Sequence, residues 1–122
     1  MSRWVCIVDD DASVRKSLAN LLRSAGYQTL SFAAGDVFLT SDLARQAGCV
    51  LLDLKMSGMN GLAVQRELAL LQWSVPVICM SAHWDEGSVQ AAMGQGALAC
   101  LAKPFSEEVL LKVVEEALTG CQ

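Results

Sequence analysis

The chain has 122 residues, a length that suits one domain over residues 1–122. Because 53% of the residues are apolar and only 18% are charged, we expect a buried core, and the composition excludes disorder. The net charge is −4, and no lysine or arginine cluster is predicted on any face, which argues against direct nucleic-acid binding by this domain. No run of residues is apolar enough to span a membrane and no signal-peptide pattern is present, so we expect a cytoplasmic protein without a membrane partner.

Short apolar runs alternate along the chain with segments of helical periodicity. Strands are predicted at residues 4–8, 28–32, 49–53, 76–80 and 98–102. Helices are predicted at residues 14–22, with Asp11 or Ser13 as the cap and Gly26 as the stop, and at residues 36–43, 62–71, 85–93 and 106–118. This pattern predicts an α/β fold of the flavodoxin-like (βα)5 kind, with a parallel sheet in strand order 2-1-3-4-5 and helices on both faces.

The five cysteines are odd in number, lack CxxC pairs and mostly lie inside apolar runs. Buried free thiols in a reducing compartment are therefore expected, rather than a disulfide or a zinc site. A redox role stays open only for Cys121, near the end of the sequence.

Polar residues end four of the predicted strands. Asp9 and Asp10 follow the first, Asp53 ends the third, and Ser81 and Lys103 follow the fourth and fifth. Because the carboxyl ends of parallel strands meet at one edge of a sheet, we expect these side chains to share one site. Any one of them alone would more often be a cap or a turn residue, but their joint placement favours a function.

The residue types of this set suit phosphoryl chemistry. Three carboxylates repel one another unless a cation lies among them, and all-oxygen ligation favours Mg²⁺. The Ser81 hydroxyl and the Lys103 ammonium suit the oxygens of a phosphoryl group. The Asp53 carboxylate can act as the nucleophile and form an aspartyl-phosphate.

These motifs together resemble the receiver domain of two-component response regulators. The residues that carry the resemblance are Val8-Asp9-Asp10-Asp11, Leu52-Asp53-Leu54-Lys55-Met56 with Gly58 and Gly61, Ser81-Ala82, and Lys103-Pro104-Phe105. Residues 14–18 are most similar to receivers that precede a helix-turn-helix output domain, which implies transcription control.

The resemblance implies a role for each site residue. Asp53 matches the phosphoacceptor, and the Mg²⁺ site would use Asp10, Asp53 and the backbone carbonyl of Lys55, with Asp9 acting through water. Ser81 matches the switch hydroxyl, and Lys103 matches the lysine that contacts the phosphoryl group. The Lys103–Pro104 peptide is usually cis in this family.

Two departures from the family pattern stand out. Ser57 replaces the usual proline four residues after Asp53, so we expect a looser loop. Cys100 replaces the aromatic residue that swings inward on activation, so ring rotation cannot be the switch and the movement of Ser81 would have to serve alone. Lys55 and His83 are expected to border the path of the water that hydrolyses the phosphoryl group.

The family implies a regulatory domain rather than an enzyme, one that assists its own phosphotransfer and dephosphorylation. Its phosphodonor partner would be a histidine kinase or a phosphotransfer protein. The readout surface would be formed by residues 88–95, 98–101 and 106–116, the fourth helix, fifth strand and fifth helix, which also allow a homodimer.

Three other classes compete with this interpretation. A haloacid-dehalogenase-type phosphatase would need a second aspartate where Lys55 stands. A flavodoxin-like electron carrier would need a phosphate-binding loop where Asp9, Asp10 and Asp11 would repel an anion. A metal-independent pseudo-receiver, used only for protein interaction, is disfavoured by the complete acidic set but stays open.

Overall fold

The computed structural model describes residues 3–81 and 86–119. Five parallel strands form one sheet in the order β2-β1-β3-β4-β5, as predicted. The strands are β1 (Trp4–Val8), β2 (Gln28–Phe32), β3 (Cys49–Asp53), β4 (Val77–Ser81) and β5 (Ala99–Ala102). The helices are α1 (Ala12–Ser24), α2 (Gly35–Leu39), the 3-10 turn η1 (Leu43–Gln46), α3 (Gly61–Leu70), α4 (Glu86–Gly94) and α5 (Glu107–Thr119).

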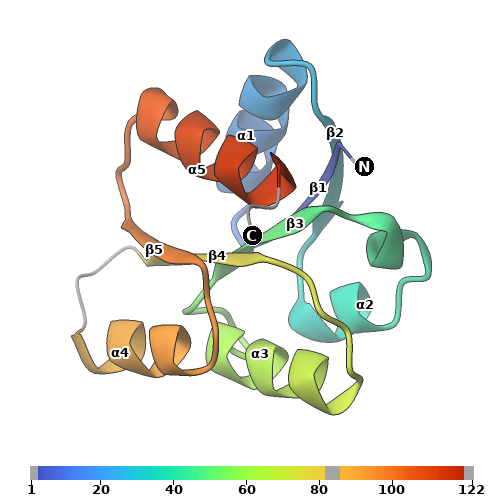
Figure 1. Ribbon diagram of the computed structural model, residues 1–122, viewed down its shortest axis with the longest axis vertical. Coiled ribbons are helices and arrows are strands. Elements are labelled where there is room, and N and C mark those ends of the chain that lie inside the picture. Colours follow the sequence, from blue (N-terminus) through green and yellow to red (C-terminus); the bar gives the residue numbers. More distant parts are fainter. Residues whose placement is uncertain (1–2, 82–85, 120–122) are drawn as a thin grey trace.

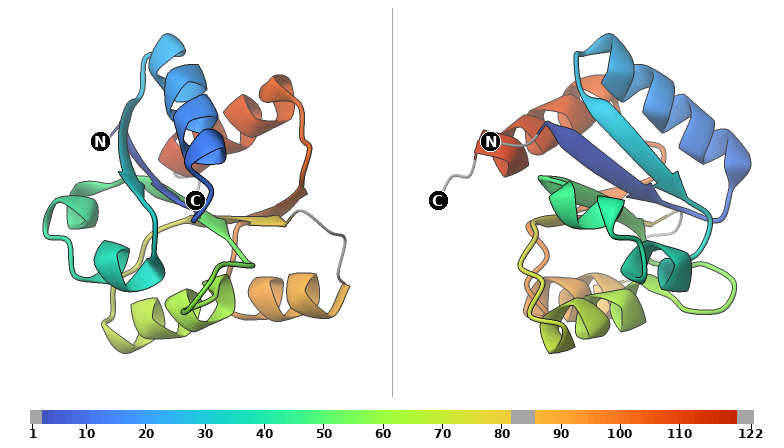
Figure 2. Two further views of the ribbon diagram at one scale, coloured as in Figure 1. Left: turned by 180° about the vertical axis from the view of Figure 1, so that it is seen from behind. Right: turned by 90° about the vertical axis from the view of Figure 1, so that its right-hand side faces the viewer.

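Helices cover both faces of the sheet, which confirms the predicted three layers. Helices α1 and α5 pack on one face, and α2, α3 and α4 pack on the other (Figures 1 and 2). Side chains of β3 alternate between the two cores: Leu51 belongs to the α1/α5 side, and Leu52 to the other. All residues of β3 and β4 are buried, because each of these strands has a strand on either side and helices on both faces.

Capping residues set the ends of two helices beside the site. Asp11, and not Ser13, caps α1, since its Oδ1 accepts hydrogen bonds from the backbone N–H of Ser13 (2.8 Å) and of Val14 (3.3 Å). Ser106 caps α5 by accepting from the N–H of Val109 at 3.1 Å. Both helices therefore begin next to residues that the sequence analysis assigned to the site.

The predicted helix over residues 36–43 was wrong in length. Helix α2 stops at Leu39, where the Thr40 hydroxyl donates to the backbone oxygen of Asp36 at 3.0 Å, and a separate 3-10 turn follows. Of the apolar residues that suggested one long helix, only Phe38 is buried, whereas Val37 is 53% and Leu43 61% exposed. Because Leu43 is exposed, extending the helix to this residue would bury no further apolar side chain.

The fourth and fifth strands begin one residue later than predicted. Pro76 lies just outside β4, although its carbonyl oxygen still accepts from the N–H of Val50 at 3.0 Å. Leu98 lies just outside β5 and is 48% exposed.

Three basic residues of α1 lie on one side of the helix. Arg15, Lys16 and Arg23 line one shallow pocket between α1 and β2. They lie together because positions seven or eight apart return to the same side of a helix.

The cysteines within the described ranges have the predicted character. Cys6, Cys49 and Cys79 are buried free thiols, and Cys100 is a half-buried one. Burial raises the pKa of the Cys6 and Cys49 thiols to about 12, so they are poor nucleophiles. Cys121 and His83 lie outside the described residues. Among the described residues, no helix has the length and apolar character needed to cross a bilayer.

Candidate functional site

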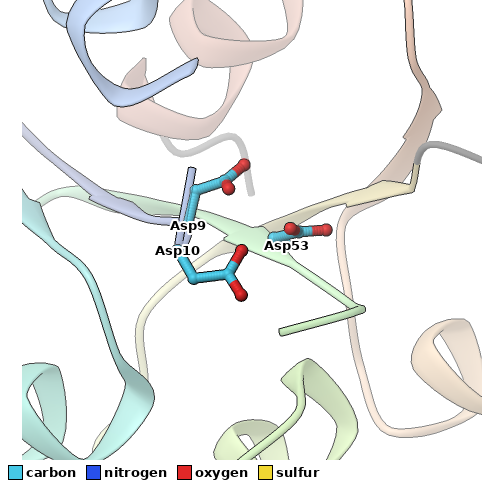
Figure 3. Close-up of side chains that lie close together, drawn as sticks. All are labelled: Asp9, Asp10 and Asp53. Atoms are coloured by element: carbon cyan, nitrogen blue, oxygen red, sulfur yellow. The ribbon is translucent and has the colours of Figure 1, made fainter. Parts of the chain in front are cut away.

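Three carboxylates meet at the carboxyl edge of the sheet. Asp9 and Asp10 follow β1, and Asp53 ends β3, which pairs with β1 in a register that sets Val8 beside Leu52. One carboxylate oxygen from each aspartate lies within 4.8 Å of the others (Figure 3). Asp9 and Asp53 are buried, at 1% and 5% exposed, whereas Asp10 faces solvent. The predicted acidic cluster is therefore assembled by strands that are distant in sequence.

Lys103 connects two of these carboxylates. Its ammonium nitrogen lies 2.8 Å from Asp9 Oδ2 and 3.6 Å from Asp53 Oδ2, and its side chain is 19% exposed. The backbone N–H of Lys103 also donates to the carbonyl oxygen of Ser81 at 2.6 Å, which joins the ends of β4 and β5. The Lys103–Pro104 peptide is cis, as the resemblance implies.

The main chain around Asp9 is held by several donors and acceptors. Its N–H donates to the backbone oxygen of Phe32 at 3.1 Å, and its Oδ1 accepts from the N–H of Asp11 at 2.9 Å. The Arg15 guanidinium donates to the Asp9 carbonyl oxygen at 2.7 Å. Asp9 is thus fixed in one orientation, and Arg15 is a supporting residue that no sequence motif predicted.

Burial, together with the negative charge of Asp9, raises the pKa of Asp53 to about 6, against the opposing effect of Lys103. The N–H of Lys55 donates to Asp53 Oδ1 at 3.3 Å, which favours the ionised form but does not offset burial. An anionic Asp53 is therefore costly in the protein without a cation, and a divalent ion at the cluster would lower that cost.

This pKa predicts how stability depends on pH in the metal-free protein. Between the ordinary pKa of 3.8 and the folded value of about 6, the folded state binds more protons than the unfolded state. Stability should therefore fall as the pH rises through this window, by up to about 3 kcal/mol. Urea unfolding in a chelator, at about pH 4 and about pH 7, should show Asp53→Asn to be more stable than the parent only at the higher pH. Equal stability of the two proteins at both pH values would contradict the raised pKa.

Asp10 is held by a residue from the loop after β3. Ser57 donates to Asp10 Oδ2 twice, from its backbone N–H at 2.9 Å and from its hydroxyl at 3.0 Å. These two hydrogen bonds lower the pKa of Asp10. Ser57, which was expected to leave this loop looser than a proline would, thus ties the loop to the segment after β1.

The remaining predicted residues surround the cluster. Ser81 is buried at the end of β4, 4% exposed. Lys55 is exposed, and its backbone lies beside the Asp53 carboxylate. Cys100 is half-buried in β5, next to Cys79 in the register of β4 and packed against the core beneath α3 and α4.

The donor set fits a small divalent cation. All the clustered groups are carboxylate oxygens, which Mg²⁺ prefers, and their mutual repulsion calls for positive charge. Asp10 and Asp53 could hold the ion, and the backbone N–H of Lys55 lies 3.3 Å from Asp53 Oδ1, next to the cluster. The fold and this cluster together define a flavodoxin-like α/β domain with an acidic site at the carboxyl edge of its sheet.

Comparison with known proteins agrees with this class. The family described as response regulator receiver domain matches residues 5–115. Response regulator protein TodT of Pseudomonas putida is 41% identical over 115 residues, and nodulation protein W of Bradyrhizobium diazoefficiens is 38% identical over 113. Each alignment covers 93% of this chain and 50% of the relative, so the chain spans about half the length of these relatives.

Solved structures show the same architecture. A response regulator receiver protein from Burkholderia phymatum is 40% identical with a TM-score of 0.83, and the match covers 97% of this chain and 96% of that one. The structure titled FixJ-N is 29% identical with a TM-score of 0.89, and the match covers 100% of this chain and 98% of that one. The chain belongs to the response regulator receiver domain family, and it is a receiver domain of the two-component type.

Proposed function

We propose that this domain is a phospho-accepting switch in which Asp53 takes a phosphoryl group from a histidine kinase or a phosphotransfer protein. The observation that carries the proposal is the placement of the Lys103 ammonium against both Asp9 and Asp53. Such an ammonium can receive the oxygens of a phosphoryl group bound to Asp53, and the clustered carboxylates can hold the Mg²⁺ that the chemistry needs.

In the proposed reaction, a carboxylate oxygen of Asp53 forms a bond to phosphorus as the phosphorus–nitrogen bond of the donor phosphohistidine breaks. The bound ion would neutralise charge on the phosphoryl oxygens. Lys103 would exchange part of its contact with the carboxylates for the phosphoryl group. Asp9, buried and fixed by Asp11 and Arg15, would act on the ion through water.

The signal would leave the site through β4 and β5. Ser81 and Lys103 are joined by a backbone hydrogen bond of 2.6 Å, so a shift of the Ser81 hydroxyl toward the phosphoryl group would also move the end of β5. Cys100 lies in that strand, where it offers no ring to rotate. Movement of the strand ends would then be the switch.

The receiving surface would be formed by α4, β5 and α5. Met93, Leu98 and Val109 are 45%, 48% and 45% exposed on these elements and their connections, which suits contact with an output domain or with a second copy of the chain. Since relatives such as transcriptional regulatory protein TdiR of Thauera aromatica are about twice as long, we propose that residues 1–122 form one receiver module that controls transcription through an attached output domain in the cytoplasm. We assign no nucleic-acid contact to this module, whose net charge is −4.

Incubation with a small acyl-phosphate donor and Mg²⁺ tests the acceptor. Intact-protein mass spectrometry should show one added phosphoryl group that hydroxylamine removes, as expected of an acyl phosphate, and Asp53→Asn should show none. Asp36→Asn, at an exposed aspartate in the first turn of α2, is the matched control and should be labelled like the parent. Labelling that persists in Asp53→Asn would refute the choice of acceptor, and an unlabelled parent protein would favour the metal-independent pseudo-receiver.

A further inference from the structure

Ser57 is tied to the acidic cluster across a sequence separation of 47 residues. It lies in the loop between β3 and α3, and the next residue, Gly58, has a φ of +75°, a conformation that glycine adopts without strain. The loop turns at this point and brings the N–H and the hydroxyl of Ser57 to the same oxygen, Asp10 Oδ2, at 2.9 and 3.0 Å.

Both contacts fall on one oxygen of a carboxylate that has two. A carboxylate can accept on either oxygen, so two donors on Oδ2 leave Oδ1 available for a metal ion. In Figure 3 one oxygen of Asp10 points toward Asp53 and the other points away from it. Asp10 is exposed, so these two hydrogen bonds restrain the rotation of its carboxylate where packing does not.

We infer that Ser57 is a positioning residue for the cation: it orients the Asp10 carboxylate for Mg²⁺ and thereby sets the affinity of the site for the ion. This inference rests on the proposed function, in which Asp10 is a ligand. Hydrogen bonds to a ligating carboxylate fix its direction, and their loss commonly weakens metal binding about 10- to 100-fold. The proline usual at this position in the family could supply neither donor.

Isothermal calorimetry of Mg²⁺ binding tests the inference without phosphorylation. Ser57→Thr keeps both donors and should bind Mg²⁺ like the parent protein. Ser57→Ala keeps only the N–H and should bind several-fold more weakly, and Ser57→Pro, which loses both donors, should bind about 10-fold more weakly or worse. Ser24→Ala removes an exposed hydroxyl at the end of α1 and should leave the affinity unchanged.

The outcomes separate the two claims. Native affinity in Ser57→Ala together with lost binding in Asp10→Asn would overturn the role of Ser57 and leave the proposed metal site standing. Tighter binding in Ser57→Ala would also overturn it, because the serine would then compete with the ion for Asp10. A parent protein that does not bind Mg²⁺ at all would overturn both. Melting curves in a chelator show whether each variant is folded. If Ser57→Pro does not fold, the Mg²⁺ affinity of Ser57→Ala still tests the role of Ser57.

Discussion

Magnesium is expected to raise the free energy of unfolding of this protein by about 2.7 kcal/mol when the free ion is at a hundredfold excess over its dissociation constant. The physical reason is that the ion binds the folded arrangement of Asp9, Asp10 and Asp53, which the unfolded chain does not have. Urea unfolding followed by far-ultraviolet circular dichroism, with and without Mg²⁺, measures the difference.

Asp10→Asn should abolish this stabilisation and leave the fold intact. An amide oxygen can still accept from Ser57, so the loop contact need not be lost, but the charge that attracts the ion is removed. Potassium chloride at equal ionic strength controls for general screening. A Mg²⁺-dependent rise of the same size in Asp10→Asn would show that the ion binds elsewhere.

Gly61→Ala is expected to destabilise the protein by about 1–3 kcal/mol, the usual cost of adding a carbon to a packed position. A Cβ on Gly61 would lie 2.6 Å from the backbone oxygen of Asp53 and 2.8 Å from Leu54 Cα. Both neighbours are backbone atoms, so α3 or the end of β3 must move. Because Asp53 itself would be displaced, Mg²⁺ affinity measured by calorimetry should fall together with stability.

Gly94→Ala is the matched control for this change. Gly94 ends α4, and a Cβ there would meet nothing within 4 Å. Since alanine is a better helix former than glycine, stability should stay the same or rise by up to about 1 kcal/mol, with unchanged Mg²⁺ affinity. If Gly61→Ala behaved like this control, the close approach of α3 to Asp53 would not constrain the site.

Local sequence patterns predicted most of the fold because they report what each segment can bury. Five apolar runs alternate with helical segments, and only a parallel sheet with helices on both faces buries them all. The exceptions have local causes: α2 stops where Thr40 bonds back to Asp36, and Leu43, which a longer helix would have included, is 61% exposed.

The sequence by itself determined that Asp9, Asp10, Asp53, Ser81 and Lys103 share one edge of the sheet, since parallel strands all end on the same side.

Which atoms meet at this edge was decided only by the tertiary structure. The two hydrogen bonds from Ser57 to Asp10, the Arg15 contact to Asp9 and the position of Lys103 between two carboxylates depend on where loops turn and side chains rotate. Periodicity and strand order specify the faces and ends of elements, whereas a hydrogen bond of 2.9 Å requires that donor and acceptor from separate segments be placed within a fraction of an ångström. The packing of the whole domain supplies that placement.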